Sequence, residues 1–354
     1  MSAIAATATA LPPHYYSQDQ LIAAFRELWS KRHYNVERIE QFHRNVLVGG
    51  RHLALSLDEY AGLRGFQDSN DAWIRVALEL GETTLKTLFE RSGVEPGDIS
   101  YFVSTTVTGL AVPSIEARLM NRFDFASGVK RVPLFGLGCL AGAAGIARVA
   151  DYLVGHPKEV GILLAVELCS LTLQREDLSV ANIVSSGLFG DGAAAVLITG
   201  SEYSGPARKN QPRILDSRSV FYPGTERVMG WDIVDTGFKI VLDSTVGDFA
   251  RKNLRPHVVD FLQTHGLTMQ DINVWIAHPG GPKVIEGMVE GLGLAPDALR
   301  LSISSLQEVG NLSSASVLFV LEETLRQQEY APGTYAMMLA MGPAFSAELI
   351  LLQF

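Results

Sequence analysis

The sequence predicts an α/β protein built from two similar halves. Short apolar runs alternate with longer segments in which apolar residues recur at helical spacing, as is typical of α/β folds. The same order of strand, loop and helix signals occurs twice, in residues 1–200 and again in residues 201–354. With 354 residues, of which 47% are hydrophobic, the chain is long enough to bury a large core in two domains or two fused halves.

The first half begins with a predicted strand and two predicted helices. The strand is the short, mostly apolar run Ile4–Ala10, and the segments Gln20–Lys31 and Val36–Asn45 are expected to be helical. The chain is expected to be irregular around Arg51–Tyr60.

A long helix is expected before the next strand. Ser69 or Asn70 is a suitable N-cap, and apolar residues recur at helical spacing until Gly93 ends the helix. A loop rich in glycine, proline and acidic residues then leads to the strand Tyr101–Thr105.

The second half repeats this order. A predicted helix at Val246–Thr264 and a short loop lead to the strand Val274–Ala277. In each half a further strand follows a later helix, at Val160–Val166 in the first half and at Tyr335–Ala340 in the second.

The spacing along the two halves also agrees. Cys139 lies 41 residues after Asp98, and Asn311 lies 40 residues after Asp271, at the same place in the repeated pattern. Each of Cys139 and Asn311 follows a glycine and is expected to open a helix. If a pseudo-twofold axis relates the halves, Cys139 and Asn311 approach one another from opposite helix starts.

The stretch around Cys139 carries the strongest chemical signal. An apolar run, Val132–Phe135, leads into Gly136 and Gly138, and small residues that favour a helix follow Cys139. A cysteine near a helix N-terminus is expected to have a lowered pKa, because the helix dipole favours the nucleophilic thiolate. A buried, inert cysteine is the alternative.

Two further residues complete a candidate catalytic group. His278 ends a predicted strand and precedes Pro-Gly-Gly-Pro, which fixes an unusual backbone path. With Asn311 it would supply two neutral N–H donors for an oxyanion. The alternatives are a surface histidine and an N-cap asparagine, or a cysteine hydrolase in which Asn311 orients His278.

Composition excludes several classes of protein. The net charge of −9 argues against a surface that binds nucleic acid or anionic membranes. Two cysteines in a chain of this length do not form a disulfide framework, so a reducing cytosol is the expected compartment. The N-terminus lacks the basic start of a signal peptide, and no apolar run reaches the roughly 18 residues of a membrane span. A cytoplasmic location is therefore predicted.

Four motifs occur in order along nearly the whole chain: Phe135–Cys139, Leu188–Ala195, Trp275–Pro282 and Gly310–Ala315. Together they resemble the type III polyketide synthases, the chalcone synthase-like enzymes. The resemblance implies a thiolase-like fold with a layered αβαβα core, a homodimer, and no metal or organic cofactor. It also implies an acyltransferase that loads an acyl group from acyl-CoA, extends it by decarboxylative condensation with malonyl-CoA and cyclises the product.

The resemblance also assigns roles to residues. Cys139 becomes the nucleophile and acyl carrier; His278 activates it and, with Asn311, stabilises the thioester oxyanion and the enolate. The positions carried over for substrate binding are Phe189 and Phe238 as gatekeepers, Cys169, Thr172 and Ser313 in the cavity, and Val112 across the dimer interface. The candidate cations for coenzyme A phosphates are Lys283, Arg38 and Arg44.

Departures from the plant enzymes indicate the starter. The loop Ala340–Phe345 keeps only Gly-Pro of the family's Gly-Phe-Gly-Pro-Gly, and the segment His52–Trp73 resembles bacterial members, many of which use fatty acyl starters. The small Cys169 fits a cavity that is open to an alkyl chain. We therefore predict a fatty acyl-CoA starter and an alkylpyrone or alkylresorcinol product.

Three other functions stay open at the level of sequence. A single-condensation ketosynthase shares the fold and triad, although Pro-Gly-Gly-Pro after His278 differs from the Gln-Ala-Asn of that class. A cysteine-dependent acyl-CoA hydrolase or acyltransferase would use the same residues without forming a carbon–carbon bond. A non-catalytic dimer partner would keep only the fold, and the presence of Cys139, His278 and Asn311 argues against it.

Overall fold

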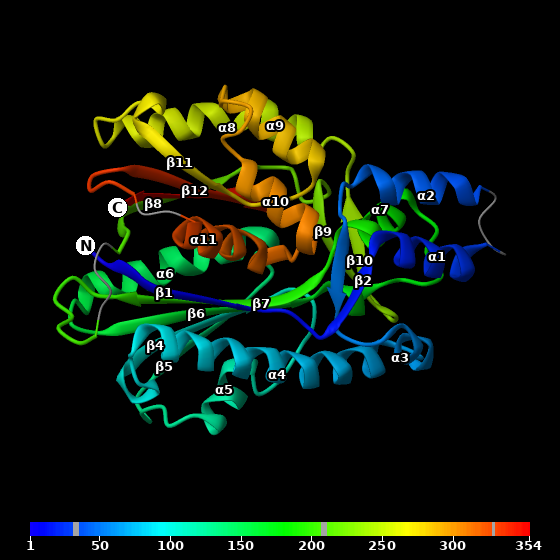
Figure 1. Ribbon diagram of the computed structural model, residues 1–354, viewed down its shortest axis with the longest axis horizontal. Coiled ribbons are helices and arrows are strands. Elements are labelled where there is room, and N and C mark those ends of the chain that lie inside the picture. Colours follow the sequence, from blue (N-terminus) through cyan, green and yellow to red (C-terminus); the bar gives the residue numbers. More distant parts are fainter. Residues whose placement is uncertain (31–34, 207–210, 328–329) are drawn as a thin grey trace.

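The computed structural model describes residues 1–30, 35–206, 211–327 and 330–354, which form five layers of helices and strands (Figure 1). The layers are α4 (Phe66–Ser92) with α5 (Ile115–Leu119), a first group of strands, α6 (Ala141–Gly155) with α11 (Ser316–Gln327), a second group of strands, and α8 (Val246–Gln263) with α9 (Pro282–Leu292). The αβαβα layering expected from the sequence is therefore confirmed.

Within the described residues the strands form one nine-stranded sheet and two separate pairs. The first group of strands in the large sheet comprises β1 (Ala3–Ala10), β4 (Ile99–Thr106), β5 (Lys130–Phe135), β6 (Val160–Leu168) and β7 (Asp191–Thr199). The second group comprises β8 (Arg213–Phe221), β11 (Ile272–Ala277), β12 (Tyr335–Gly342) and β13 (Ser346–Gln353). The pairs are β2 (His14–Ser17) with β3 (Gly50–Leu53), and β9 (Met229–Val234) with β10 (Gly237–Leu242).

The strand order shows the internal duplication directly. The first group runs β1-β7-β6-β4-β5 and the second runs β8-β13-β12-β11, with matching parallel and antiparallel pairings. The described residues of the second group contain no counterpart of the edge strand β5. The two groups join through β1 and β8, where Ala3 pairs with Arg213.

The remaining helices lie beside the strand layers, at the end of the molecule away from both termini (Figure 1). They are α1 (Gln18–Trp29), α2 (Val36–Asn45), α3 (Leu57–Gly62) and α7 (Val180–Leu188). One further helix, α10 (Arg300–Val309), directly precedes α11 in the chain. The predicted end of the first helix, Lys31, lies outside the described residues. The segment Arg51–Tyr60 is more regular than expected, because it contains most of β3 and the start of α3.

The start of the long helix α4 also differs from the prediction. The helix begins at Phe66 after an extended Gly65, so neither Ser69 nor Asn70 caps it. The side chain of Asn70 instead exchanges two hydrogen bonds with the backbone of Leu110, at 2.9 and 2.8 Å. A polar residue that is well suited to a cap is used here to hold a loop that is distant in sequence.

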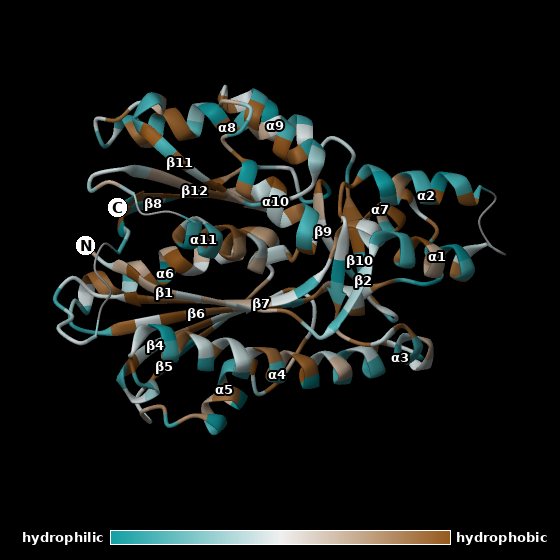
Figure 2. Cartoon of the chain, in the orientation of Figure 1, coloured by the Kyte–Doolittle hydropathy of each residue, from teal (hydrophilic) through white to brown (hydrophobic). Residues whose placement is uncertain are grey.

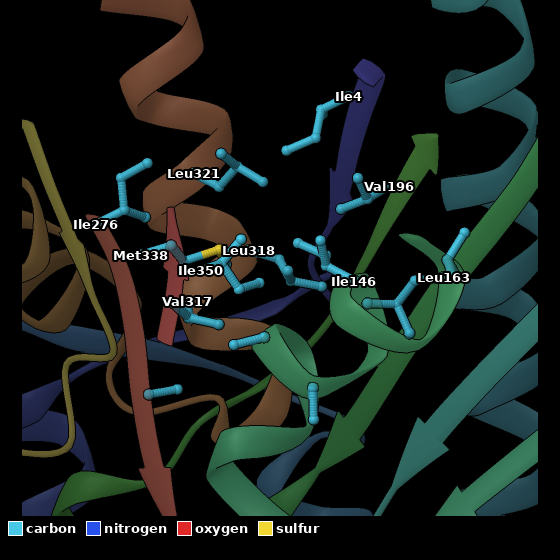
Figure 3. Close-up of a cluster of buried hydrophobic side chains, with 14 of the residues drawn as sticks. Ile4, Ile146, Leu163, Val196, Ile276, Val317, Leu318, Leu321, Met338 and Ile350 are labelled. Carbon is cyan, nitrogen blue, oxygen red and sulfur yellow. The ribbon is translucent and has the colours of Figure 1, made fainter. Parts of the chain in front are cut away.

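The core lies around the two central helices, α6 and α11. Figure 3 shows that Ile146 of α6 and Leu318 and Leu321 of α11 share one buried cluster with residues of both strand groups, including Leu163 and Met338. The strands β6 and β12, on either side, consist mostly of hydrophobic residues (Figure 2). This shared core fixes the start of α6 against the start of α11. No helix in the described part of the chain is long and apolar enough to cross a bilayer.

Candidate active site

Cys139 lies in a tight 3-10 turn between β5 and α6. Gly138, just before it, has a φ of +55°, and a Cβ there would lie 2.5 Å from Cδ of Pro343, so this turn requires glycine. The Cys139 side chain is 5% exposed, and its Sγ lies 3.6 Å from Oγ of Ser313. The loop that contains Gly342 and Pro343 therefore packs directly against the turn of Cys139.

The resting state of Cys139 differs from the sequence-based expectation. Burial raises the pKa of the thiol to about 12, although the hydrogen bond with Ser313 acts in the opposite direction; the nearby Glu167 carboxylate raises the pKa further. The loss of hydration exceeds the effect of the helix dipole, so Cys139 rests as a thiol. It would therefore need a base before it could act as a nucleophile.

His278 follows β11, where its backbone N–H donates to the carbonyl of Leu339 at 2.9 Å. The side chain is buried, and neither Nδ1 nor Nε2 has a hydrogen-bond partner among the described residues. Burial lowers the pKa of His278 to about 3, so the ring is neutral near pH 7. A neutral imidazole offers one acceptor and one donor, and both are free for a thiol and a substrate.

Asn311 is held much more firmly. Its backbone N–H donates to Leu188 O at 2.9 Å, its Oδ1 accepts from Ser313 N at 2.8 Å, and its Nδ2 donates to Gly280 O at 3.2 Å. These contacts fix the amide so that Oδ1 and Nδ2 cannot exchange places. Because the amide carries two hydrogens, one N–H is left to donate to a ligand.

A continuous series of contacts connects the three predicted catalytic residues. Cys139 touches Ser313, whose backbone N–H donates to Asn311; Asn311 in turn donates to Gly280, which donates to the carbonyl of His278 at 3.0 Å. The turns after β5 and β11 and the turn between α10 and α11 therefore meet. A 3-10 turn, Ser313–Ala315, separates Asn311 from α11, so Asn311 does not open the helix itself.

Glu167, at the end of β6, is a buried carboxyl group that the sequence reasoning missed. It accepts hydrogen bonds from Val107 N at 3.1 Å, from Thr108 Oγ1 at 2.9 Å and from Ser314 Oγ. Burial raises its pKa to about 7, although these hydrogen bonds favour the carboxylate. The available signal in the sequence was an acidic residue within an otherwise apolar strand. Burial of a carboxyl group is costly unless hydrogen bonds compensate for the lost hydration, so such a residue indicates a buried polar network.

A cavity of about 690 Å³ lies between α1, α3, α7 and the β9–β10 hairpin. Three predicted substrate-binding residues line it, namely Phe189, Cys169 and Thr172. Most of the wall is apolar, with Leu21, Ala24, Phe25, Leu28, Leu53, Leu57, Ala61, Leu173, Phe189, Trp231 and Ile240. Polar groups, including Arg51, Tyr60 and Ser185, are interspersed with these side chains.

The structure does not place Phe238 in the wall of this cavity. The ring of Phe238 is buried against Phe66 and Phe135, with ring centroids 5.5 and 6.3 Å apart. The residues that the β9–β10 hairpin presents to the cavity are Trp231 and Ile240. Position within a hairpin depends on register, which is why the sequence could not separate these residues.

The other predicted site residues lie outside the cavity wall. Ser313 is buried beside Cys139, whereas Val112 is 96% exposed in the loop after β4. Lys283 is exposed in the first turn of α9. On α2, Arg44 forms an ion pair with Asp19 at 3.0 Å and Arg38 lies over the ring of Phe42. The described residues contain no cluster of His, Cys, Asp and Glu side chains that could hold a metal ion.

Comparison with known proteins identifies the family. Residues 70–211 match the family model of FAE1/Type III polyketide synthase-like proteins, and residues 213–354 match the C-terminal domain of chalcone and stilbene synthases. The chain is 46% identical to 1,3,6,8-tetrahydroxynaphthalene synthase of Streptomyces peucetius subsp. caesius, over 99% of this chain and 93% of that protein. The chain belongs to the type III polyketide synthases.

Other relatives agree with this assignment. The chain is 30% identical to 3,5-dihydroxyphenylacetyl-CoA synthase of Streptomyces toyocaensis, over 99% of this chain and 89% of the relative. The crystal structure of the tetrahydroxynaphthalene synthase of Streptomyces coelicolor A3(2) superimposes with a TM-score of 0.93 at 27% identity, over 99% of both chains.

Membership of the family confirms the thiolase-like fold and the activity of a decarboxylating, condensing acyltransferase that acts on coenzyme A thioesters. It decides against the non-catalytic dimer partner, and it favours the polyketide synthase over the single-condensation ketosynthase and the hydrolase.

Proposed function

We propose that this type III polyketide synthase uses Cys139 as nucleophile and acyl carrier, with His278 and Asn311 as its partners. The observation that supports this proposal is the series of contacts from Cys139 through Ser313 and Asn311 to the loop of His278. The reaction needs a nucleophile, a base and oxyanion donors in one buried place, and these residues supply all three.

Loading of the starter begins with the neutral imidazole of His278. The imidazole accepts the proton of Cys139 as Sγ forms a bond to the thioester carbonyl carbon of the acyl-CoA. The bond from that carbon to the coenzyme A sulfur breaks, and His278 returns the proton to the leaving thiolate. Because burial disfavours both the thiolate and the imidazolium, the two charges form as an adjacent pair.

Extension uses the same donors. Loss of carbon dioxide from malonyl-CoA leaves an enolate, whose oxygen accepts hydrogen bonds from His278 and from the remaining N–H of Asn311. The enolate carbon then attacks the acyl carbonyl carbon, and the thiolate of Cys139 leaves. No step of this scheme needs a metal or an organic cofactor.

The apolar cavity wall supports a fatty acyl-CoA starter and an alkylpyrone or alkylresorcinol product. Cys169, which is small and buried, lies in the same wall as Leu21, Leu28 and Leu173. An alkyl chain that enters this space loses contact with water, which is worth about 0.8 kcal/mol per buried CH₂ before entropic costs. Starter selectivity is therefore proposed to rise with chain length until the cavity is full.

A second candidate product follows from the relatives. The 46% identical protein is named for a tetrahydroxynaphthalene, a polyhydroxylated aromatic compound without an alkyl chain. Such a product fits condensation of malonyl units alone. The cavity volume of about 690 Å³ also accommodates a compact aromatic product of this kind.

The starter is tested with isotopically labelled malonyl-CoA, alone and with acyl-CoAs of increasing chain length, followed by mass spectrometry of the products. A fatty starter predicts that long acyl-CoAs give the highest turnover, and that Cys169→Phe moves the optimum to shorter chains while Cys169→Ala does not. A tetrahydroxynaphthalene made from malonyl-CoA alone, with no gain from any acyl-CoA, would establish the second candidate instead.

The surface around Val112 supports a homodimer. Leu110, Val112 and Phe135 are apolar and exposed, and β5 is an edge strand with unpaired backbone groups. Exposed apolar patches beside a free edge are typical of interfaces, so we propose that a second copy covers this surface. Analytical ultracentrifugation of the wild type and of Val112→Asp tests it; a monomeric wild type would contradict the proposal.

Three cations are proposed to meet coenzyme A phosphates, namely Lys283, Arg38 and Arg44. A lysine supplies a flexible point charge and an arginine a planar fork of donors, and both suit an exposed phosphate. Single changes to alanine at these positions are expected to raise the KM for acyl-CoA and leave kcat nearly unchanged.

We further propose a cytoplasmic location and a boundary between the two halves at residues 200 and 201.

A further inference from the structure

The β9–β10 hairpin forms part of the cavity wall but is not joined to the large sheet. Within the described residues, β9 and β10 pair only with each other. Trp231 of β9 and Ile240 of β10 are direct cross-strand partners, and both line the cavity. Because an isolated two-stranded hairpin is only marginally stable, contacts with the rest of the molecule must fix the position of this part of the wall.

The hairpin contacts the rest of the molecule through β10, which packs on α7 and on the turn Cys169–Thr172 (Figure 1). Part of this contact is apolar, since the ring of Phe238 is buried against Phe66 and Phe135. Hydrophobic contact is not directional, so it holds the hairpin on the surface without fixing its exact position. Directional contacts come from residues 173–179, which connect the turn to α7.

Gln174, in this connecting segment, binds the hairpin with both ends of its amide. Its Nε2 donates to the carbonyls of Thr236 and Phe238, each at 3.2 Å, and its Oε1 accepts from the Thr236 hydroxyl at 2.5 Å. Because the oxygen and the nitrogen are both engaged, the amide cannot rotate without losing a hydrogen bond. Lys239 and Asp177 add an exposed and therefore weaker ion pair at 3.5 Å.

The backbone of Gln174 is itself fixed to the cavity wall. Asn182 is a buried residue of α7 that lines the cavity, and its Nδ2 donates to the carbonyls of Gln174 and Asp177 at 2.8 and 2.7 Å. Thr172, two residues before Gln174, also lines the cavity, and its hydroxyl donates to Cys169 O at 2.7 Å. Gln174 therefore joins the wall made by this turn and α7 to the wall made by the hairpin.

We propose that Gln174 is a positioning residue that determines starter specificity by fixing Trp231 and Ile240 in the cavity wall. This inference rests on the proposed function, because it concerns the acyl group that Cys139 accepts. An apolar pocket with a fixed wall discriminates against a chain that is one or two methylenes too long, whereas a wall that shifts admits it. Gln174 does not itself line the cavity, so its effect is exerted through the hairpin.

The test compares acyl-CoAs of increasing chain length in the wild type and in Gln174→Ala. The rate of Cys139 acylation is followed by mass spectrometry of the intact protein, and the ratio of rates for the best starter and for the next longer ones measures discrimination. Gln174→Ala is expected to lower this ratio about threefold to tenfold, as for loss of one net hydrogen bond. Gln263→Ala, which changes an exposed glutamine at the end of α8, is the matched control and should keep the wild-type profile.

Two milder variants separate the contacts of the amide. Thr236→Val removes only an exposed hydroxyl and should lower discrimination in the same direction by a smaller factor. Gln174→Glu places a carboxylate against the carbonyls of Thr236 and Phe238 and should lower it at least as much as alanine. Thermal unfolding of each variant is measured alongside, and Thr236→Val provides the test if Gln174→Ala does not fold.

A double variant shows whether Gln174 acts through the hairpin. In Trp231→Ala the wall residue is already removed, so adding Gln174→Ala should change discrimination little further. The proposal would be overturned by an equal further loss in the double variant. It would also be overturned if Gln174→Ala and Thr236→Val both kept the wild-type profile.

The two proposals fail in different ways. A wild type that no acyl-CoA acylates at Cys139 contradicts the function on which the role of Gln174 depends. A wild type that is acylated with the same chain-length profile as Gln174→Ala contradicts the role of Gln174 alone.

Discussion

The turns that carry Cys139 and Asn311 are equivalent in the duplicated fold but are built differently. Each follows a glycine with positive φ, +55° at Gly138 and +77° at Gly310, and each residue is buried shortly before a central helix. The turn of Cys139 follows strand β5, whereas that of Asn311 follows helix α10 and is anchored by a bridge to Phe189.

The freedom of the two side chains differs accordingly. The thiol of Cys139 touches only the Ser313 hydroxyl among the described hydrogen-bonding groups. Both polar atoms of the Asn311 side chain are engaged, by Ser313 and by Gly280. A nucleophile must move to form and break bonds, whereas an oxyanion donor acts best when it is fixed in advance. The geometry therefore suits the proposed roles, with a reactive group on one duplicated turn and a rigid donor on the other.

Cys139→Ala is expected to have the largest effect. The variant cannot form the thioester, so acylation and condensation should be lost, while the fold is retained because alanine fits a turn rich in small residues. Mass spectrometry of the protein after incubation with acyl-CoA, and product assays, provide the measurement. Cys169→Ala, at the other buried cysteine, is the matched control and should still be acylated at Cys139; product formation by Cys139→Ala would refute its role.

Asn311→Ala is expected to reduce malonyl-CoA decarboxylation by about 10²–10³, the usual cost of losing one oxyanion donor. His278→Ala should reduce it further, because base and donor are lost together. Release of labelled carbon dioxide measures this step separately from loading. Asn121→Ala changes an exposed asparagine and serves as the control. An unchanged decarboxylation rate in Asn311→Ala would show that the fixed amide has no part in this step.

The two turn glycines are expected to differ in their effect on stability. In Gly310→Ala, the new Cβ would lie 2.8 Å from the carbonyl oxygen of Leu188, and the φ of +77° with ψ of −168° suits only glycine. In Gly138→Ala, the Cβ meets the ring of Pro343 rather than a backbone atom nearby, and the φ of +55° is a left-handed value that alanine can adopt at a modest cost. We expect losses in the free energy of unfolding of about 2–4 kcal/mol and about 1–2 kcal/mol respectively. Denaturant unfolding measures both, and equal losses would contradict the difference in rigidity between the turns.

The pH dependence of stability tests the buried environment that the turns share with His278. Burial lowers the pKa of His278 to about 3, so this residue binds a proton at higher pH in the unfolded chain than in the folded one. The contribution of His278 to the free energy of unfolding is therefore fully present above pH 6.5 and is lost on acidification from pH 6.5 towards pH 3. At pH 5 the loss is about 2 kcal/mol. Thermal unfolding of the wild type and His278→Gln between pH 5 and 7 is the measurement. If the unfolding temperatures of the wild type and His278→Gln changed equally with pH, His278 would not be buried as described.

Several features of the site could be predicted from the sequence because they depend on short segments. Glycines before Cys139 and Asn311, and Pro-Gly-Gly-Pro after His278, mark turns at the ends of regular elements, and turns of this kind hold functional side chains. The repeated spacing placed Cys139 opposite Asn311, and the structure joins them through Ser313. Strand alternation and helical periodicity likewise depend on neighbours in sequence, which is why most elements were located correctly.

Tertiary structure alone decided the charge states and the cavity. The helix start predicted a reactive thiolate at Cys139, but the surrounding core removes water and raises the pKa to about 12. Trp231 and Ile240, rather than Phe238, face the cavity because of the way the β9–β10 hairpin packs on α7 and on the turn Cys169–Thr172. Only folding brought Arg51 to the cavity wall, where its side chain is buried. Desolvation and packing depend on residues that are distant in the chain, so no local pattern in the sequence records them.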